Sequence, residues 1–124
     1  MKRETKVPII GIVDDDESVR MATSSLIRSV GYRAALFASA EAFLTSGQID
    51  EMDCLIVDLH MPQLGGLELS QRLAEMNNPI PIIFVSALHD ELRARALNEG
   101  AVAVLAKPFN DKALLSAIHS ALQS

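Results

Sequence analysis

The sequence is poor in cysteine and in basic residues. Its one cysteine, Cys54, cannot form a disulfide within the chain, which fits a reducing, cytoplasmic setting. Only 11 Lys and Arg residues stand against 16 Asp and Glu, so the net charge is −5. Direct binding to nucleic acid needs clustered cations and is therefore not expected. The apolar runs are too short to span a bilayer and the N-terminus is polar, so neither membrane attachment nor a secretory signal is expected.

The composition is that of an ordinary globular protein. Hydrophobic residues make up 49% of the 124 residues and charged residues 22%, which excludes a disordered or collagen-like chain. A chain of this length can bury roughly two-thirds of the surface that it exposes when unfolded. We expect a single domain over residues 1–124, with an ordered core at about 7–122 and no second domain on this chain.

Short apolar runs alternate along the chain with segments of helical spacing. The apolar runs predict strands at 7–13, 33–37, 54–57, 82–85 and 101–105. The spacing predicts helices at 17–30, 39–46, 67–76, 90–98 and 111–122. Runs that are apolar throughout indicate strands covered on both faces, so the pattern predicts an α/β fold with a doubly wound, five-stranded parallel sheet. Ligands of such sheets bind at the carboxyl ends of the strands.

Polar side chains follow four of the predicted strands. Asp14, Asp15 and their acidic neighbours follow the first, Asp58 the third, Ser86 the fourth and Lys107 the fifth. Clustered carboxylates repel one another, and a hard divalent cation relieves that repulsion. Oxygen ligands in a wet pocket suit Mg²⁺, with Mn²⁺ as a substitute. A carboxylate beside such an ion is also a nucleophile for phosphoryl transfer, with an ammonium and a hydroxyl to bind phosphoryl oxygens.

Four segments resemble the receiver domain of two-component response regulators. They are residues 12–17 (IVDDDE), 55–66 (LIVDLHMPQLGG), 85–87 (VSA) and 106–109 (AKPF). Residues 39–44 (SAEAFL) are further similar to FixJ-type receivers. The resemblance covers essentially the whole chain and implies a flavodoxin-like (βα)₅ fold with strand order 2-1-3-4-5.

The resemblance also implies a role for each acid of the cluster. Asp58 would be the phosphoacceptor and would touch the metal. Asp15 would bind Mg²⁺ directly, and Asp14 would bind it through water. The backbone carbonyl of His60 would be a further metal ligand.

The remaining roles concern the switch between unphosphorylated and phosphorylated states. Ser86 would be the hydroxyl that turns toward the phosphoryl group, and Lys107 would pair with that group. The bond between Lys107 and Pro108 would be cis, and Ala87 is small where the phosphoryl group must enter. One departure is Val104, because the family usually has an aromatic residue there that swings inward on activation.

The implied function is that of a signalling domain rather than an enzyme acting on other substrates. A sensor histidine kinase would phosphorylate Asp58, and the domain would promote its own dephosphorylation by water. The surface around the fourth helix and fifth strand would then form a homodimer or bind an effector. The sequence identifies neither the kinase nor the output.

Three other functions are weighed against the same residues. An interaction module with this fold that works without phosphorylation is the main alternative, and the absent aromatic residue at Val104 favours it. A phosphatase with an aspartate nucleophile is disfavoured, because His60, two residues after Asp58, is not a second acid. A Rossmann-type nucleotide site is disfavoured, because acids follow the first strand and repel a pyrophosphate.

Simpler interpretations hold for some single residues. The acidic run 14–17 alone could be a helix start, and Asp16 and Glu17 are assigned to that role. A metal-binding side chain is not favoured for His60 or His89. A milder hypothesis is that His60 overhangs the site and alters the access of water to the acyl phosphate.

Overall fold

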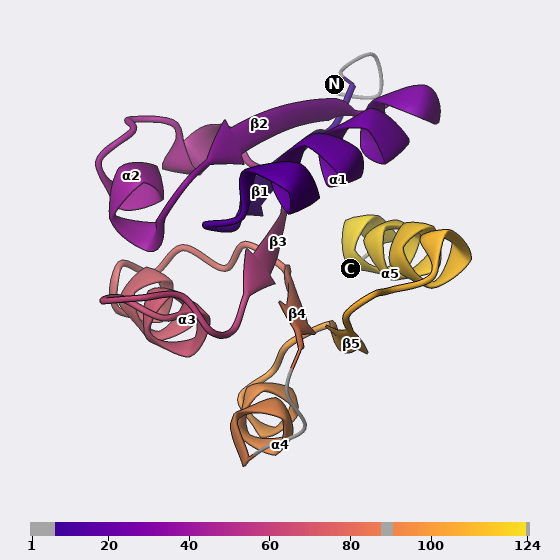
Figure 1. Ribbon diagram of the computed structural model, residues 1–124. Coiled ribbons are helices and arrows are strands. Elements are labelled where there is room, and N and C mark those ends of the chain that lie inside the picture. The colour runs from indigo at the N-terminus through magenta and orange to yellow at the C-terminus, as the bar shows by residue number, and fades with distance from the viewer. Residues whose placement is uncertain (1–6, 88–90, 124) are drawn as a thin grey trace.

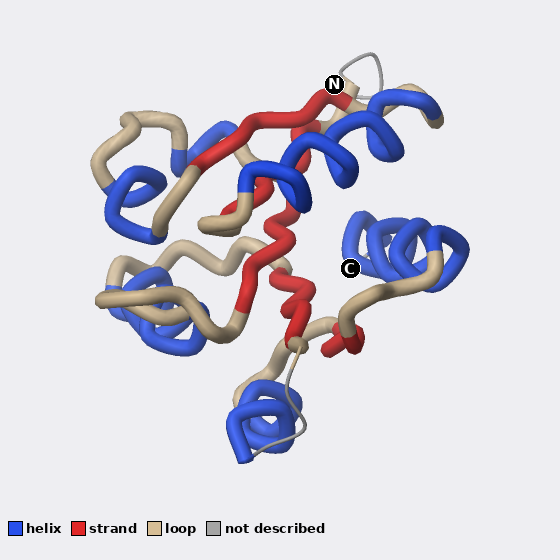
Figure 2. The backbone as a smooth tube through the Cα atoms, in the orientation of Figure 1, coloured by secondary structure: helices blue, strands red, loops and turns tan. Residues whose placement is uncertain are grey.

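The computed structural model describes residues 7–87 and 91–123, which form a five-stranded parallel sheet between two layers of helices (Figures 1 and 2). The strand order is β2-β1-β3-β4-β5, which confirms the doubly wound fold. The strands are β1 (Ile9–Val13), β2 (Arg33–Phe37), β3 (Cys54–Asp58), β4 (Ile82–Ser86) and β5 (Ala103–Ala106). The helices are α1 (Glu17–Ser29), α2 (Ala40–Leu44), α3 (Gly66–Glu75), α4 (Glu91–Asn98) and α5 (Asp111–Gln123), with a short 3₁₀ turn, η2 (Ile49–Glu51).

The sheet divides the apolar core into two clusters. Figure 1 shows α1 and α5 on one side of the sheet and α2 and α3 on the other. Ile10 and Ile12 of β1 belong to the cluster that contains the α1 and α5 side chains, whereas Val13 belongs to the cluster that contains side chains of α2, α3 and α4. All five residues of β3 and of β4 are buried. Helices on both faces explain why these strands are apolar throughout rather than alternating.

Local signals in the sequence set several helix ends. The Asp16 carboxylate accepts hydrogen bonds from the backbone N–H groups of Ser18 and Val19, so Asp16 is the N-cap of α1. Ser39 Oγ accepts a hydrogen bond from Ala42 N at 3.0 Å and caps α2 in the same way. Gly31 follows α1 with a φ of 100°, a conformation that favours glycine. The helix-start interpretation of Asp16 is therefore confirmed.

Several predicted boundaries are wrong by one or two residues. The strand predicted at 7–13 begins at Ile9, and the strand predicted at 101–105 lies at Ala103–Ala106. The third and fourth strands each extend one residue further, so that Asp58 and Ser86 are their last residues. The reason is that a strand is bounded by its pairing partner rather than by its apolar content, and Ser86 pairs in register with Ala106.

Helix ends show similar differences. The first helix ends at Ser29 rather than at residue 30, the second at Leu44 rather than at residue 46, and the last continues to Gln123. The third begins at Gly66 and ends at Glu75. The fourth was predicted to begin at residue 90, which lies outside the described residues. The η2 turn was not predicted. Among the helices of the described residues, none is long and apolar enough to cross a membrane.

Candidate functional site

The predicted cluster of acids forms at the carboxyl edge of the sheet. Asp14 directly follows β1, Asp58 ends β3, and β1 and β3 are paired neighbours. Carboxylate oxygens of Asp14, Asp15 and Asp58 all lie within 4.8 Å of one another. Asp14 and Asp58 are buried, whereas Asp15 is exposed. The cluster therefore has two members fixed in the protein and one on the solvent side.

Lys107 supplies the positive charge of the site. Its Nζ donates to Asp14 Oδ2 at 3.0 Å and to Asp58 Oδ2 at 3.2 Å. Burial alone would lower the pKa of Lys107, but the two carboxylates outweigh it and raise that pKa above its ordinary value. The ammonium therefore stays charged and holds the two buried carboxylates together.

Asp14 is an acid that the fold makes costly to ionise. Its side chain is 2% exposed, and this burial raises the pKa of Asp14 above 3.8, with a smaller contribution from the charge of Asp58. The backbone N–H of Asp16 and the ammonium of Lys107 act in the opposite direction without cancelling the effect. The Lys107 ammonium is shared between Asp14 and Asp58, so it lowers the pKa of Asp14 by less than burial raises it.

The residues of the cluster fit a divalent cation. With all groups ionised, the three carboxylates (−3) and the Lys107 ammonium (+1) sum to −2, and the Arg20 guanidinium, which donates to the Asp14 carbonyl at 2.7 Å, lies next to them. The donor set consists of oxygens alone, and exposed Asp15 leaves room for metal-bound water. Hard oxygen ligands with retained waters are the coordination that Mg²⁺ prefers.

Asp58 is held through both of its carboxylate oxygens. Oδ1 accepts a hydrogen bond from the backbone N–H of His60 at 3.0 Å, and Oδ2 accepts from Lys107. The chain beyond it is held to the next strand, because Leu59 N donates to the Val85 carbonyl at 2.9 Å. The carboxylate thus has a fixed orientation at the sheet edge.

A glycine allows α3 to pack directly behind Asp58. A Cβ built on Gly66 would lie 2.5 Å from the Asp58 carbonyl oxygen and 3.0 Å from Leu59 Cα. Both neighbours are backbone atoms. The first turn of α3 therefore supports the backbone that carries the Asp58 side chain.

Ser86 lies beside this cluster and interacts with His60. The Ser86 side chain is 1% exposed, and its Oγ is 3.1 Å from Nε2 of His60. The Ser86 carbonyl accepts a hydrogen bond from Lys107 N at 2.8 Å. The sequence singled out His60 for its carbonyl and for its position after Asp58, but did not predict the contact between its ring and Ser86. The adjacency of β3 and β4 was the available signal.

The other predicted residues lie around this edge. Ala87 follows Ser86 and is exposed. Val104 lies in β5, in register with Phe84, and packs as a half-buried side chain against the cluster that includes α3 and α4. The peptide bond between Lys107 and Pro108 is cis, as the resemblance implies. The carbonyl of His60 remains a predicted metal ligand.

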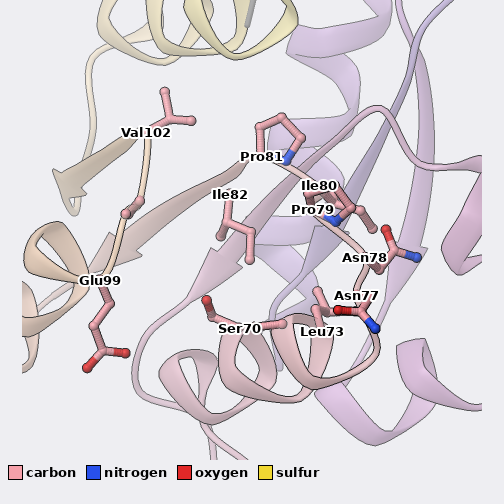
Figure 3. Close-up of a pocket in the computed structure, with 13 residues that line it drawn as sticks. Ser70, Leu73, Asn77, Asn78, Pro79, Ile80, Pro81, Ile82, Glu99 and Val102 are labelled. Atoms are coloured by element: carbon pink, nitrogen blue, oxygen red, sulfur yellow. The ribbon is translucent and has the colours of Figure 1, made fainter.

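Of two hollows on the surface, one lies away from this site and the other reaches it. One of about 610 Å³ lies at the opposite edge of the sheet, between α3, residues 77–81 and the turn before β5 (Figure 3). Another, of about 420 Å³, lies between α1 and the segment after β5 and reaches Lys107. Its lining is mainly apolar and includes Val19, Leu26 and Phe109. The acidic cluster thus lies at the carboxyl edge of the sheet and does not line the larger of these two hollows.

Comparisons with known proteins agree with this geometry. The family model described as the response regulator receiver domain matches residues 10–119. The response regulator protein TmoT of Ectopseudomonas mendocina is 45% identical over 117 residues, which are 93% of this chain and 53% of that protein. The transcriptional regulatory protein FixJ of Bradyrhizobium diazoefficiens is 36% identical over 115 residues, 92% of this chain and 56% of that protein.

Solved structures give the same result. The crystal structure of FixJ-N has a TM-score of 0.86 and 31% identity, and the alignment covers 96% of both chains. This chain spans about half the length of the curated relatives it matches.

Proposed function

The chain belongs to the response regulator receiver domain family, and from this premise we propose that a sensor histidine kinase phosphorylates Asp58. The family function is that of a phosphoacceptor in two-component signalling. The observation that carries the assignment to Asp58 is its position: it ends β3, between the strand that precedes Asp14 and the strand that ends in Ser86, and its carboxylate accepts from Lys107 within reach of Asp14 and Asp15.

The transfer step needs little covalent work from the domain. A carboxylate oxygen of Asp58 attacks the phosphorus of the kinase phosphohistidine, a P–O bond forms and the P–N bond breaks. The electron pair of the broken bond stays on the histidine nitrogen of the kinase, which takes up a proton. Lys107 remains protonated and pairs with a phosphoryl oxygen as a point charge.

We assign the Mg²⁺ site to the acid cluster. Asp15 and Asp58 would bind the ion directly, Asp14 through water, and the His60 carbonyl would complete the protein ligands. Mn²⁺ would substitute for it. The ion supplies electrostatic stabilisation of the charge on the transferring phosphoryl group. The buried position of Asp14 and the excess negative charge support this assignment.

Phosphorylation then acts as a switch. It converts the Asp58 carboxylate, with a charge of −1, into an acyl phosphate with a charge of about −2, and it places strong acceptor oxygens at the sheet edge. The Ser86 hydroxyl turns to one of these oxygens, and exposed Ala87 leaves the approach open. The change reaches the surface of α4 and β5, where a homodimer or an effector would bind. Val104 would transmit it by aliphatic packing, since it has no ring to swing inward.

The domain promotes only reactions of its own phosphoryl group. Water attacks the phosphorus of the acyl phosphate, the bond from phosphorus to the Asp58 oxygen breaks, and inorganic phosphate leaves while Asp58 returns to the carboxylate; Lys107 would stay paired with the phosphoryl oxygens. We place these reactions in the cytoplasm, where the kinase forms phosphohistidine from ATP.

The test is the intact mass after incubation with acetyl phosphate and Mg²⁺. Wild type should gain one phosphoryl group, and Asp58→Asn or removal of Mg²⁺ should abolish the gain. Asp16→Asn is the matched control, because asparagine caps a helix as well as aspartate does and the substituted acid lies outside the cluster. No adduct in wild type, where a known receiver is modified under the same conditions, would instead favour an interaction module that works without phosphorylation.

A further inference from the structure

The contact between the His60 ring and Ser86 is not explained by the roles assigned above. Nε2 of His60 lies 3.1 Å from Ser86 Oγ, and the His60 side chain is half-buried. Ser86 Oγ is an almost completely buried hydroxyl at the end of β4. A buried hydroxyl with a hydrogen-bond partner has a preferred orientation, because losing that partner without replacement is costly.

His60 contacts both of the groups that are proposed to meet the phosphoryl group. Its backbone N–H donates to Asp58 Oδ1 at 3.0 Å, and its ring contacts the Ser86 hydroxyl. Asp58 and Ser86 end neighbouring strands that are paired in parallel. The orientation of the hydroxyl is thus linked, through one residue, to the acceptor carboxylate.

We infer that His60 is a positioning residue that holds the Ser86 hydroxyl in its resting orientation and competes with a phosphoryl group for it. This inference rests on the proposed function, in which that hydroxyl turns to a phosphoryl oxygen. A change from one staggered rotamer to the next moves Oγ by about 2 Å, which breaks a 3.1 Å hydrogen bond. The competition holds whichever of the two atoms donates the proton.

The competition sets the size of the expected effect. A hydrogen bond between uncharged groups is worth a factor of roughly three to ten in an equilibrium constant after exchange with water. If the resting state keeps this bond and the phosphorylated state gives it up, removing it should favour the phosphorylated state by the same factor. His60 would thus restrain activation without taking part in the chemistry.

Two amide substitutions test the inference with little change in size. Glutamine places its terminal amide near the position of imidazole Nε2, and asparagine reaches only the position of Nδ1. His60→Gln should therefore keep the contact with Ser86, and His60→Asn should lose it. The probe is trifluoroberyllate with Mg²⁺, which mimics an acyl phosphate, and the readout is its affinity from an NMR titration of backbone amides.

We expect His60→Asn to bind the probe roughly threefold to tenfold more tightly than wild type, and His60→Gln to remain within about twofold. In a Ser86→Ala background, His60→Asn should have no further effect, because the partner is already absent. A merely structural role for His60 would not distinguish Gln from Asn in this way. Thermal unfolding of each variant checks that it is folded.

Other results would overturn the inference. Equal affinities of wild type and His60→Asn would show that the contact does not restrain Ser86. Weaker binding by His60→Asn would place the ring in contact with the phosphoryl group itself. An effect that persists with Ser86→Ala would show that His60 acts elsewhere. Failure of wild type to bind the probe in a manner that requires Asp58 and Mg²⁺ would refute the proposed function as well.

Discussion

Replacing Gly66 with alanine tests whether α3 supports the phosphoacceptor backbone. The added Cβ would lie 2.5 Å from the Asp58 carbonyl oxygen, whereas an ordinary contact begins at 3.4 Å. The difference, 3.4 − 2.5, means that backbone atoms must move by about 0.9 Å. Because the first turn of α3 and the end of β3 are both regular structure, neither can move freely.

Two effects of this substitution oppose each other. Alanine is a better helix former than glycine by up to about 1 kcal/mol, and less than that in a first turn. Overpacking of a well-packed site costs typically about 1–3 kcal/mol. The clash should win, since the neighbouring atoms belong to the backbone and have no other rotamer. We expect Gly66→Ala to lower the free energy of unfolding by about 1–3 kcal/mol.

Gly65→Ala is the matched control. A Cβ at Gly65 would lie 3.4 Å from the Leu59 carbonyl oxygen, which is ordinary contact. Alanine is a poorer N-cap than glycine, so this variant should lose at most about 1 kcal/mol. The assay is urea unfolding followed by circular dichroism, in which a loss of 2 kcal/mol shifts the midpoint by about 1 M.

The same variants should differ in phosphorylation. The displaced carbonyl in Gly66→Ala belongs to Asp58, so its rate of phosphorylation by acetyl phosphate should fall while that of Gly65→Ala stays close to wild type. Unfolding data showing Gly66→Ala to be as stable as wild type, or more so, would refute the reasoning, because helix propensity would then outweigh the contact.

Three further predictions concern charge and burial. Burial raises the pKa of Asp14, so the stability that this group contributes is fully present below pH 3.8 and is lost as the pH rises through its folded-state pKa. The stability of Asp14→Asn relative to metal-free wild type should therefore increase from pH 4 to pH 7 in thermal unfolding. A difference between the two proteins that stays constant over this range would contradict the prediction. Mg²⁺ should stabilise wild type by about 2.7 kcal/mol at a hundredfold excess over its dissociation constant; Asp15→Asn should lose most of that gain, and an equal gain in both would exclude Asp15 as a ligand. Burial raises the pKa of Cys54 to about 12, so the thiol should react with Ellman's reagent at pH 8 only at the rate of unfolding, and rapid labelling of the native protein would disprove its burial.

The sequence predicts which polar side chains lie at the carboxyl edge of the sheet, because their placement there follows from simple rules. A parallel sheet brings the carboxyl ends of its strands to one edge, so the side chains after β1, β3 and β5 lie along that edge. Asp14 and Asp58 meet because they follow or end neighbouring strands, whereas Lys107 follows β5 and reaches both acids past β4, at 3.0 and 3.2 Å.

Other contacts depend on features that the sequence pattern does not contain. The contact between the His60 ring and Ser86 depends on the path that the chain takes after β3, which the spacing of apolar residues does not specify. The Glu41 carboxylate accepts a hydrogen bond from Leu64 N at 3.3 Å, across 23 positions of sequence. The strand predicted at 101–105 was misplaced because its limits depend on pairing with β4. Each of these is decided by tertiary geometry rather than by local preference.

The position of Lys107 has a consequence for how the sheet opens. Its acidic partners follow or end the inner strands β1 and β3, but Lys107 follows β5, which is a short edge strand with a partly exposed surface. Edge strands open locally at lower free energy than central ones, so their backbone amides exchange sooner with solvent deuterium. Opening of β5 would withdraw the Lys107 ammonium from Asp14 and Asp58 and so increase the repulsion between these two acids. The ion pairs from Lys107 to these carboxylates therefore also stabilise the edge of the sheet, so the local opening of β5 and the repulsion between the acids are thermodynamically coupled.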